Sequence, residues 1–205
     1  AKQLAGAHTL EVVTLDDGFD PAKVKSNTDQ ILQQGVVVLA STPGIPHVKS
    51  MLPALNAAKT PLLAPGSGSL MLHGPGTEPI FHVKASFGAE IDQMATQLST
   101  MRMRKIVIIT DDAPDRESLV QRFGEQLAKA GQGESRLHKT IVIAQQGGKP
   151  QDAVAQALAE QADAVYVMTI PGLAGGMLKE LRAKSYTGYL AAWSVAGYGL
   201  AARTF

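Results

Sequence analysis

The chain has 205 residues, of which 45% are hydrophobic and 18% are charged, and its formal net charge is +1. This composition supports a buried core and argues against disorder. The basic residues are scattered, so a surface that tracks nucleic-acid phosphates is not expected. The sequence contains no cysteine, which excludes disulfides, thiol nucleophiles and cysteine-ligated zinc. No apolar run reaches the roughly 18 residues that span a bilayer.

Short apolar runs alternate with amphipathic stretches along the whole chain. Val48, Met51, Leu52, Leu55 and Ala58 share one helical face, for example. Several apolar runs are rich in Val and Ile, as strands buried on both faces are. The alternation predicts an α/β fold with parallel sheets. The predicted strands are residues 10–15, 36–40, 61–64, 80–84, 105–110, 140–144, 164–169 and 189–193.

The helix-end signals agree with this pattern. Asp20 followed by Pro21 predicts a helix start, and Gly35 marks its end. Asp115 is expected to cap a helix that runs towards Gly131. Pro53 is expected to kink the helix that contains it.

A break is predicted near residues 102–105, where a second series of strands and helices begins. It divides the chain into an N-terminal lobe, 1–103, and a C-terminal lobe, 104–205, each of ordinary domain size. Open α/β sheets bind ligands at the carboxyl ends of their strands. A small ligand is therefore expected between the two lobes.

Catalytic signatures are absent from the sequence. The five histidines do not form a zinc-protease motif, and His47 is the least ordinary of them because it opens a helix beside the expected cleft. Gly66-Ser67-Gly68 starts like a dinucleotide fingerprint, but the third glycine is missing. No catalytic residue, metal or cofactor is predicted. Three aspartates, Asp111, Asp112 and Asp115, follow the 105–110 strand; they can be read as a helix cap or as a Mg²⁺ site.

Two loops have the composition of a ligand site. Ser41-Thr42-Pro43-Gly44 follows the second predicted strand, and 65–69, Pro-Gly-Ser-Gly-Ser, follows the third. Small residues let a ligand approach the backbone, and hydroxyl groups both donate and accept hydrogen bonds. The first loop also leads into a helix whose N–H groups suit an anion. Ordinary turns have the same composition, so both readings stay open.

Several segments, in order along the chain, resemble one known family. They are residues 10–21 (Leu-Glu-Val-Val-Thr-Leu-Asp-Asp-Gly-Phe-Asp-Pro), 41–43, 60–65, 81–86, 104–112 and 162–167. Together they resemble the type I periplasmic solute-binding proteins, the branched-chain amino-acid receptor group of ABC transporters. The resemblance implies two Rossmann-like lobes that close on a small ligand.

The same resemblance implies the roles of individual residues. Ser41, Thr42, Ser67 and Ser69 would hold the ligand carboxylate. The acidic residue that often holds an amino-acid ammonium in the family falls near Ser194, where this sequence has no carboxylate. An amine-free aromatic or aliphatic acid therefore competes with an amino acid as the expected ligand, unless Asp112 or Asp115 supplies the charge. The predicted ligand-binding set also includes Gly44, Gly68 and Ile170.

The resemblance also covers less than the family's whole fold. The family's first strand has no candidate in 1–9, and its last strands lie beyond residue 205, so the chain looks like an internal portion. The vacant sheet position would leave unpaired backbone groups. We therefore expect a strand-mediated homodimer or a rearranged strand order in the first lobe.

The sequence thus predicts the solute-binding component of an ABC importer, located in the periplasm. Its partners would be a small carboxylate-bearing ligand and a membrane permease, without nucleic acid. A ligand-sensing regulatory domain of the same fold is the first alternative. A metal-dependent α/β enzyme that uses the aspartate cluster is the second.

Overall fold

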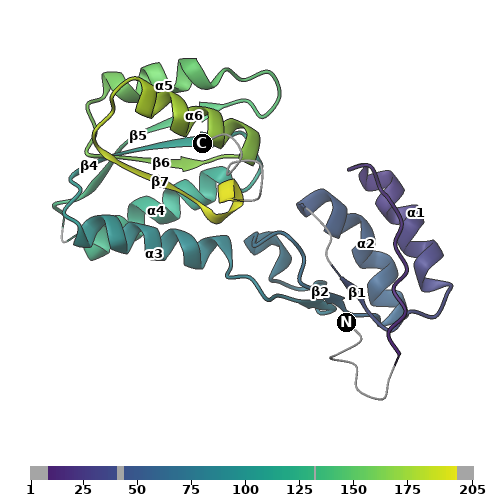
Figure 1. Cartoon of the computed structure of the whole chain (residues 1–205). Helices are drawn as coiled ribbons and strands as arrows, with labels where there is room; N and C mark the ends of the chain where they lie inside the picture. Colours follow the sequence, from purple (N-terminus) through teal and green to yellow (C-terminus); the bar gives the residue numbers. More distant parts are fainter. Residues whose placement is uncertain (1–8, 41–43, 132, 198–205) are drawn as a thin grey trace. The chain divides into compact units, whose positions relative to one another are not determined.

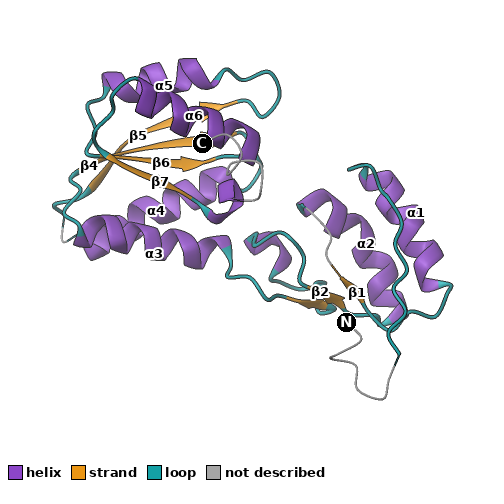
Figure 2. Cartoon of the chain, viewed as in Figure 1, coloured by secondary structure: helices purple, strands orange, loops and turns teal. Residues whose placement is uncertain are grey.

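The computed structural model describes residues 9–40, 44–131 and 133–197. The chain divides into two compact units, Ala1–Ser86 and Phe87–Phe205. Each unit combines a parallel sheet with helices (Figures 1 and 2). Among the described residues, every helix is too short or too polar to cross a membrane.

The N-terminal unit is built on a three-stranded parallel sheet in the order β1-β2-β3. Its strands are short: β1 is Leu39–Ala40, β2 is Leu62–Leu63 and β3 is Ile80–Phe81. Leu39 pairs with Leu62, which in turn pairs with Ile80. The helices of this unit are α1 (Pro21–Leu32), α2 (Ile45–Ala58) and the 3₁₀ helix η1 (Leu70–Leu72).

The core of this unit lies where α1 and α2 pack against the sheet. Its buried side chains are Val24, Leu39, Val48, Met51, Leu55, Leu62, Leu72 and Ile80. The predicted helical face of α2 supplies three of them, so the periodicity located the core correctly. Pro53 lies on the exposed side of α2, and the helix continues through it from Ile45 to Ala58.

The expected strand at 10–15 does not form, and this prediction is wrong. The residues run along a groove beside α1 and β1 without joining the sheet. A strand needs a neighbour for its backbone groups, and within the described chain β1 pairs only with β2. The apolar pattern of residues 10–15 was correctly detected, but no described strand pairs with this segment.

The C-terminal unit has a four-stranded parallel sheet in the order β5-β4-β6-β7. The strands are β4 (Lys105–Asp111), β5 (Arg136–Ile143), β6 (Ala164–Met168) and β7 (Tyr189–Ala192). The helices are α3 (Phe87–Thr100), α4 (Arg116–Ala130), α5 (Pro150–Ala159) and α6 (Pro171–Ala183), followed by the 3₁₀ helix η2 (Ser194–Gly197).

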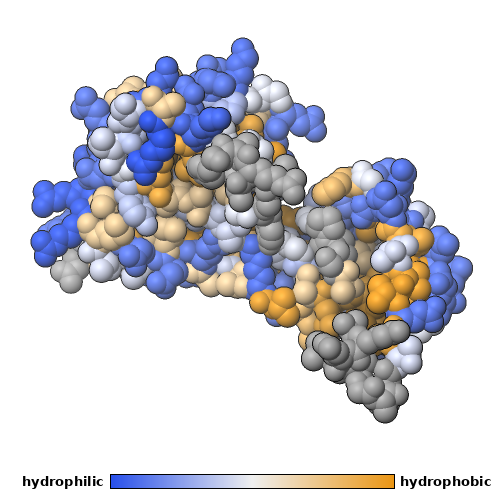
Figure 3. Space-filling view, viewed as in Figure 1, coloured by the Kyte–Doolittle hydropathy of each residue, from blue (hydrophilic) through white to orange (hydrophobic). Residues whose placement is uncertain are grey.

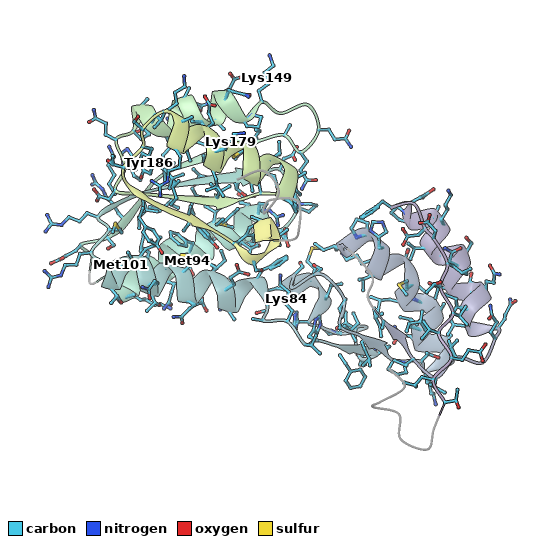
Figure 4. The ribbon with its side chains drawn as sticks, viewed as in Figure 1. Lys84, Met94, Met101, Lys149, Lys179 and Tyr186 are labelled. Carbon is cyan, nitrogen blue, oxygen red and sulfur yellow. The ribbon has the colours of Figure 1, made fainter. Side chains whose placement is uncertain are left out.

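Helices cover both faces of this second sheet. Figure 1 shows α3 and α4 on one face and α5 and α6 on the other. The central strands β4 and β6 are buried almost throughout, which explains their continuous runs of Val and Ile. Met94, labelled in Figure 4, lies on α3 and packs against the core, and Met101, also labelled, follows the end of this helix.

The contacts divide the chain earlier than the boundary expected at 103/104. Helix α3 buries Ile91, Ala95 and Leu98 in the core of the second unit. Arg122 of α4 also holds Asp92 of α3 by two bonds of 2.7 and 2.6 Å. Helix α3 therefore belongs with the second unit. In the sequence, it had been placed at the end of the first series of strands and helices.

The predicted helix ends are otherwise close to those observed. Asp20 caps α1 and accepts a hydrogen bond from the Ala22 N–H at 2.9 Å, with Pro21 in the first helical position. Asp115 and Gly131 stand at the two ends of α4. The Asp115 side chain, however, makes no capping hydrogen bond to the helix; it binds an arginine instead.

Candidate ligand-binding site

In the N-terminal unit, the candidate site starts where α2 begins, at the carboxyl edge of the sheet. Ser41 and Thr42 lie outside the described residues. Gly44 is the N-cap of α2, with φ 73° and ψ 158°. A side chain there would be strained by the backbone, and its Cβ would lie only 3.2 Å from Nδ1 of His47. The predicted small residue is thus required by local geometry.

The turn at 67–69 lies at the same edge of the sheet, after β2. Ser67, Gly68 and Ser69 are all buried. The Ser69 N–H donates to Oγ of Ser67 at 3.2 Å, and the Met71 N–H donates to Oγ of Ser69 at 3.3 Å. The two hydroxyl oxygens therefore order the turn and begin η1. Hydroxyl groups are also among the groups that carboxylates use as hydrogen-bond donors.

Two histidines stack on each other, one after η1 and the other after β3. The rings of His73 and His82 stack with 3.8 Å between their centroids and 15° between their planes. Nε2 of His82 lies 2.9 Å from the Leu72 carbonyl oxygen. Burial, and then the neighbouring His82, lower the pKa of His73. The pair ties η1 to the segment that follows β3.

His47 is buried in the first turn of α2. Neither of its ring nitrogens has a hydrogen-bond partner among the described residues. The ring contacts Phe19 edge-on, with 6.1 Å between centroids. Buried polar atoms without partners are rare and reduce stability. His47 is thus the most unusual side chain at this edge of the sheet. The sequence analysis had singled it out because it opens a helix.

In the C-terminal unit, the carboxyl end of β4 carries a buried ionic cluster. Nε of Arg116 lies 2.8 Å from Oδ1 of Asp111, and its Nη1 lies 2.5 Å from Oδ1 of Asp115. The guanidinium carbon is 4.2 Å from the centroid of the Trp193 ring. Asp111 is fully buried, and Asp115 and Arg116 are nearly so. A single cation thus balances two carboxylates.

Of two other predicted residues near this strand end, Ile170 contacts the cluster and Asp112 does not. Ile170 is the N-cap of α6, and its N–H donates to Oδ2 of Asp111 at 3.1 Å. Asp112 is exposed and accepts a hydrogen bond from the Gln145 N–H at 3.0 Å. Asp115 and Ile170 therefore meet around Asp111, whereas the Asp112 side chain points elsewhere.

A carboxylate does stand beside Ser194, so the sequence interpretation was wrong on this point. Glu90, in the first turn of α3, accepts hydrogen bonds from the backbone N–H and from Oγ of Ser194, the latter at 2.7 Å. The two residues are 104 positions apart, and only the packing of α3 against this unit joins them. Burial, and then the charge of Glu90, raise the pKa of Tyr166.

The predictions from sequence missed several residues at the carboxyl edge of the C-terminal sheet. Asp111 was noted only as part of a charge cluster, and Arg116, Trp193 and Glu90 were not singled out. An arginine beside three aspartates was the one available signal. No group of three or more His, Asp or Glu side chains in the described chain is arranged to hold a metal. Asp111 and Asp115 are paired with an arginine, which is a structural arrangement.

Both units thus place polar groups at the carboxyl edges of parallel sheets. The first offers small residues, hydroxyls and a helix start, which suit an anion. The second offers a carboxylate at Ser194 and an aromatic ring stacked on arginine. Carboxyl edges of parallel sheets are where α/β proteins commonly bind small molecules.

Comparison with known proteins identifies the family. A family model described as periplasmic binding protein matches residues 1–203. A solute-binding protein of an R. palustris ABC transporter, solved with benzoate, is 20% identical with a TM-score of 0.80; the match covers 98% of this chain and 55% of that one. A leucine-binding protein from Thermotoga maritima is 16% identical with a TM-score of 0.71, covering 91% and 53%.

A third similar structure is an extracellular ligand-binding receptor from Verminephrobacter eiseniae, which is 22% identical with a TM-score of 0.80; the match covers 89% of this chain and 52% of that one. Comparison with curated protein sequences gave no match. The chain spans about half the length of these solved structures. It belongs to the periplasmic binding protein family, and its likeness to the solved structures shows the type I fold of these proteins.

Proposed function

We propose that this chain forms part of the solute-binding component of an ABC importer and binds a small carboxylate-bearing molecule. The observation that carries the proposal is the buried turn Ser67-Gly68-Ser69, which follows β2 at the sheet edge where α2 also begins. Two hydroxyl groups and first-turn N–H groups at one sheet edge form a donor-rich surface for a carboxylate. Ser41 and Thr42 are proposed to complete it.

The carboxylate ligand is proposed to be an aromatic acid. Three similar proteins were solved with benzoate, 3,4-dihydroxybenzoic acid and 4-hydroxybenzoate, at 16–20% identity. Two carboxylates of the second unit, Asp111 and Asp115, are already paired with Arg116. An amine-free acid avoids the cost of a buried ammonium without a free partner.

An amino acid is the competing ligand, and Glu90 is the residue that favours it. Its carboxylate is half-buried and lies beside Ser194. Two hydrogen bonds from Ser194 occupy part of its acceptor capacity, but a carboxylate can accept more than two. Asp112, which is exposed, is the other proposed partner for an ammonium.

A thermal-shift screen of this chain tests the proposal. The panel would contain benzoate, 4-hydroxybenzoate, leucine and, as an uncharged control, benzamide. A ligand that binds only the native state stabilises it by about 2.7 kcal/mol at 100 times its dissociation constant. Stabilisation by the acids and not by benzamide supports carboxylate recognition; equal stabilisation by benzamide, or none by any acid, contradicts it.

Two serine variants would locate the site. Ser69→Ala removes a buried hydroxyl of the proposed site, and Ser26→Ala removes an exposed one on α1 that donates to the Lys23 carbonyl. We expect Ser69→Ala to weaken benzoate binding by about tenfold, the value of one charge-assisted hydrogen bond. Ser26→Ala should leave the affinity unchanged.

We propose that the bound solute is delivered to a membrane permease, and that the protein acts in the periplasm. The similar structures described as ABC-transporter solute-binding proteins support this assignment. A sensory role of the same ligand site is the alternative. Ligand-dependent association with a permease in membranes would support transport, whereas growth on the solute without the protein would contradict it.

A further inference from the structure

The start of helix α2 leaves its backbone donors unused. The N-cap residue is Gly44, so no side chain caps the helix. Pro46 has no N–H, and no group of the described chain accepts a hydrogen bond from the N–H of Ile45 or His47. Most helices satisfy these donors with a capping side chain. Helix α2 therefore presents free N–H groups and the positive end of its dipole at this edge of the sheet.

The ring of His47 lies at the same helix start. His47 is only 9% exposed, and both of its ring nitrogens lack a hydrogen-bond partner in the part of the chain that the structure describes. A Cβ placed on Gly44 would lie 3.2 Å from Nδ1 and 3.8 Å from Cε1, so Nδ1 is the ring atom nearest the N-cap. A buried polar atom without a partner requires an explanation, and an unused binding function is one.

Phe19 lies against the His47 ring and determines how a ligand reaches it. The two rings meet edge-on, with 6.1 Å between their centroids and 90° between their planes. Phe19 is 77% exposed, and its backbone is left-handed with φ 60°, which is unfavourable for a bulky residue. Exposed side chains change rotamer rapidly. Because most of its surface is exposed, the Phe19 ring can rotate away from His47 and open a path to Nδ1.

We propose that His47 contacts the ligand: its Nδ1–H donates to the carboxylate of the bound acid, together with the N–H groups of Ile45 and His47. This inference rests on the proposed function, because it names a specificity-determining donor within that carboxylate site. A neutral imidazole carries its proton on one nitrogen, and the Nδ1–H form is the one that donates towards the helix start. Helix N–H groups and a ring N–H that converge on one anion form charge-assisted hydrogen bonds.

The surroundings favour a monocarboxylate with an apolar body over an inorganic dianion. Lys49 is the only lysine or arginine in α2, and it is exposed. Leu70 and Met71, which directly follow Ser69, are each 44% exposed. Figure 3 shows apolar residues exposed on the surface of this unit. Sulfate and phosphate are commonly held by arginine or lysine, whereas neutral donors beside apolar side chains suit a single carboxylate on a hydrocarbon body.

Calorimetric titration of three histidine variants with benzoate tests the proposal. His47→Phe keeps a ring but removes the donor, and it should weaken binding by about tenfold, the value of one charge-assisted hydrogen bond. His47→Asn places an amide nitrogen where Nδ1 stood, so its affinity should stay within about threefold of the unaltered chain. His138→Phe is the control: His138 is exposed in the C-terminal unit, where it binds Glu160 at 2.8 Å, and its loss should leave the affinity unchanged.

Nitrogen NMR of the histidine rings gives a readout that a purely structural role would not change. Benzoate should shift the ring signals that are missing in His47→Phe, with the proton on Nδ1, and sulfate at the same concentration should not. Equal benzoate affinity in His47→Phe and the unaltered chain, unmoved His47 signals at saturating benzoate, or the same shift with sulfate would overturn this inference and leave the proposed function standing. An unaltered chain that binds neither benzoate, 4-hydroxybenzoate nor leucine would contradict both.

Discussion

Removing the cation of the buried cluster should strongly destabilise the C-terminal unit. Arg116→Met keeps a side chain of similar length but leaves Asp111 and Asp115 without their cation. Breaking a buried ion pair by removing one partner costs about 3–5 kcal/mol, because the remaining charge stays in the interior. Loss of the contact between the guanidinium and Trp193 adds to this cost.

Arg122→Met is the matched control. Arg122 lies on the same helix and also binds an aspartate by two bonds, but its side chain is 45% exposed. Exposed ion pairs contribute at most about 1 kcal/mol. The two variants therefore remove the same kind of group from buried and exposed surroundings.

Urea unfolding followed by tryptophan fluorescence measures the difference. Trp193 is the only tryptophan, so the signal reports on the unit that contains the cluster. Replacing Asp111 by Asn in the Arg116→Met background should restore part of the lost stability, since it removes the unpaired charge. An Arg116→Met variant within about 1 kcal/mol of Arg122→Met would refute this explanation of the cluster.

Three further changes have defined outcomes. His47→Phe should raise the free energy of unfolding by about 1 kcal/mol, because it removes two buried nitrogens without partners; a loss of stability in urea would contradict this. Burial, and then the charge of Asp163, raise the pKa of Tyr186 to about 12. The folded state therefore keeps a proton that the unfolded state loses, so stability should fall as the pH rises from about 10 to 12. In Tyr186→Phe this fall should be smaller, as measured by urea midpoints at both ends of the range. Glu90→Gln should lower stability by about 1–2 kcal/mol through its bonds to Ser194, and it should weaken any binding of leucine more than that of benzoate.

The surroundings of Tyr186 explain why its pKa is raised. Its hydroxyl donates to the Ala162 carbonyl at 2.8 Å, at the amino ends of β6 and β7 (Figure 4). Burial disfavours the charged phenolate, and the negative charge of Asp163 adds to this effect on the pKa of Tyr186. The nearby Arg182 has the opposite but smaller effect on this pKa.

The sequence predicted the α/β class and the parallel sheets because these depend on local patterns. The Val- and Ile-rich runs at β4 and β6 became buried central strands, and the spacing of Val48, Met51 and Leu55 became the buried face of α2. Asp20 and Pro21 began α1 as expected. Each of these signals involves residues that lie within a few positions of one another in the sequence.

The errors arose where a structure depends on distant partners. Residues 10–15 have the composition of a strand, but strand formation also requires a neighbour at the correct spacing. Glu90 reaches Ser194 across 104 positions, and no local pattern reveals that contact. The domain boundary was placed by the order of elements, whereas the packing of α3 against α4 determines where the contacts divide.

The candidate site was partly predictable for the same reason. Gly44, Ser67 and Ser69 follow strands directly, so their place at the sheet edge follows from topology. The pairing of Asp115 with Arg116 depends on how the α4 start folds back on Asp111, which composition does not specify. Carboxylates were correctly located near the edge, but their partners were not.

Calorimetric titration of the chain with benzoate is the most direct test of the central claim that it captures a carboxylate-bearing solute. We predict saturable binding of one benzoate per chain with a micromolar dissociation constant, which corresponds to about 8 kcal/mol, and no saturable binding of benzamide. If the chain is folded by circular dichroism yet gives no saturable heat with benzoate, 4-hydroxybenzoate or leucine at millimolar concentrations, the claim is contradicted.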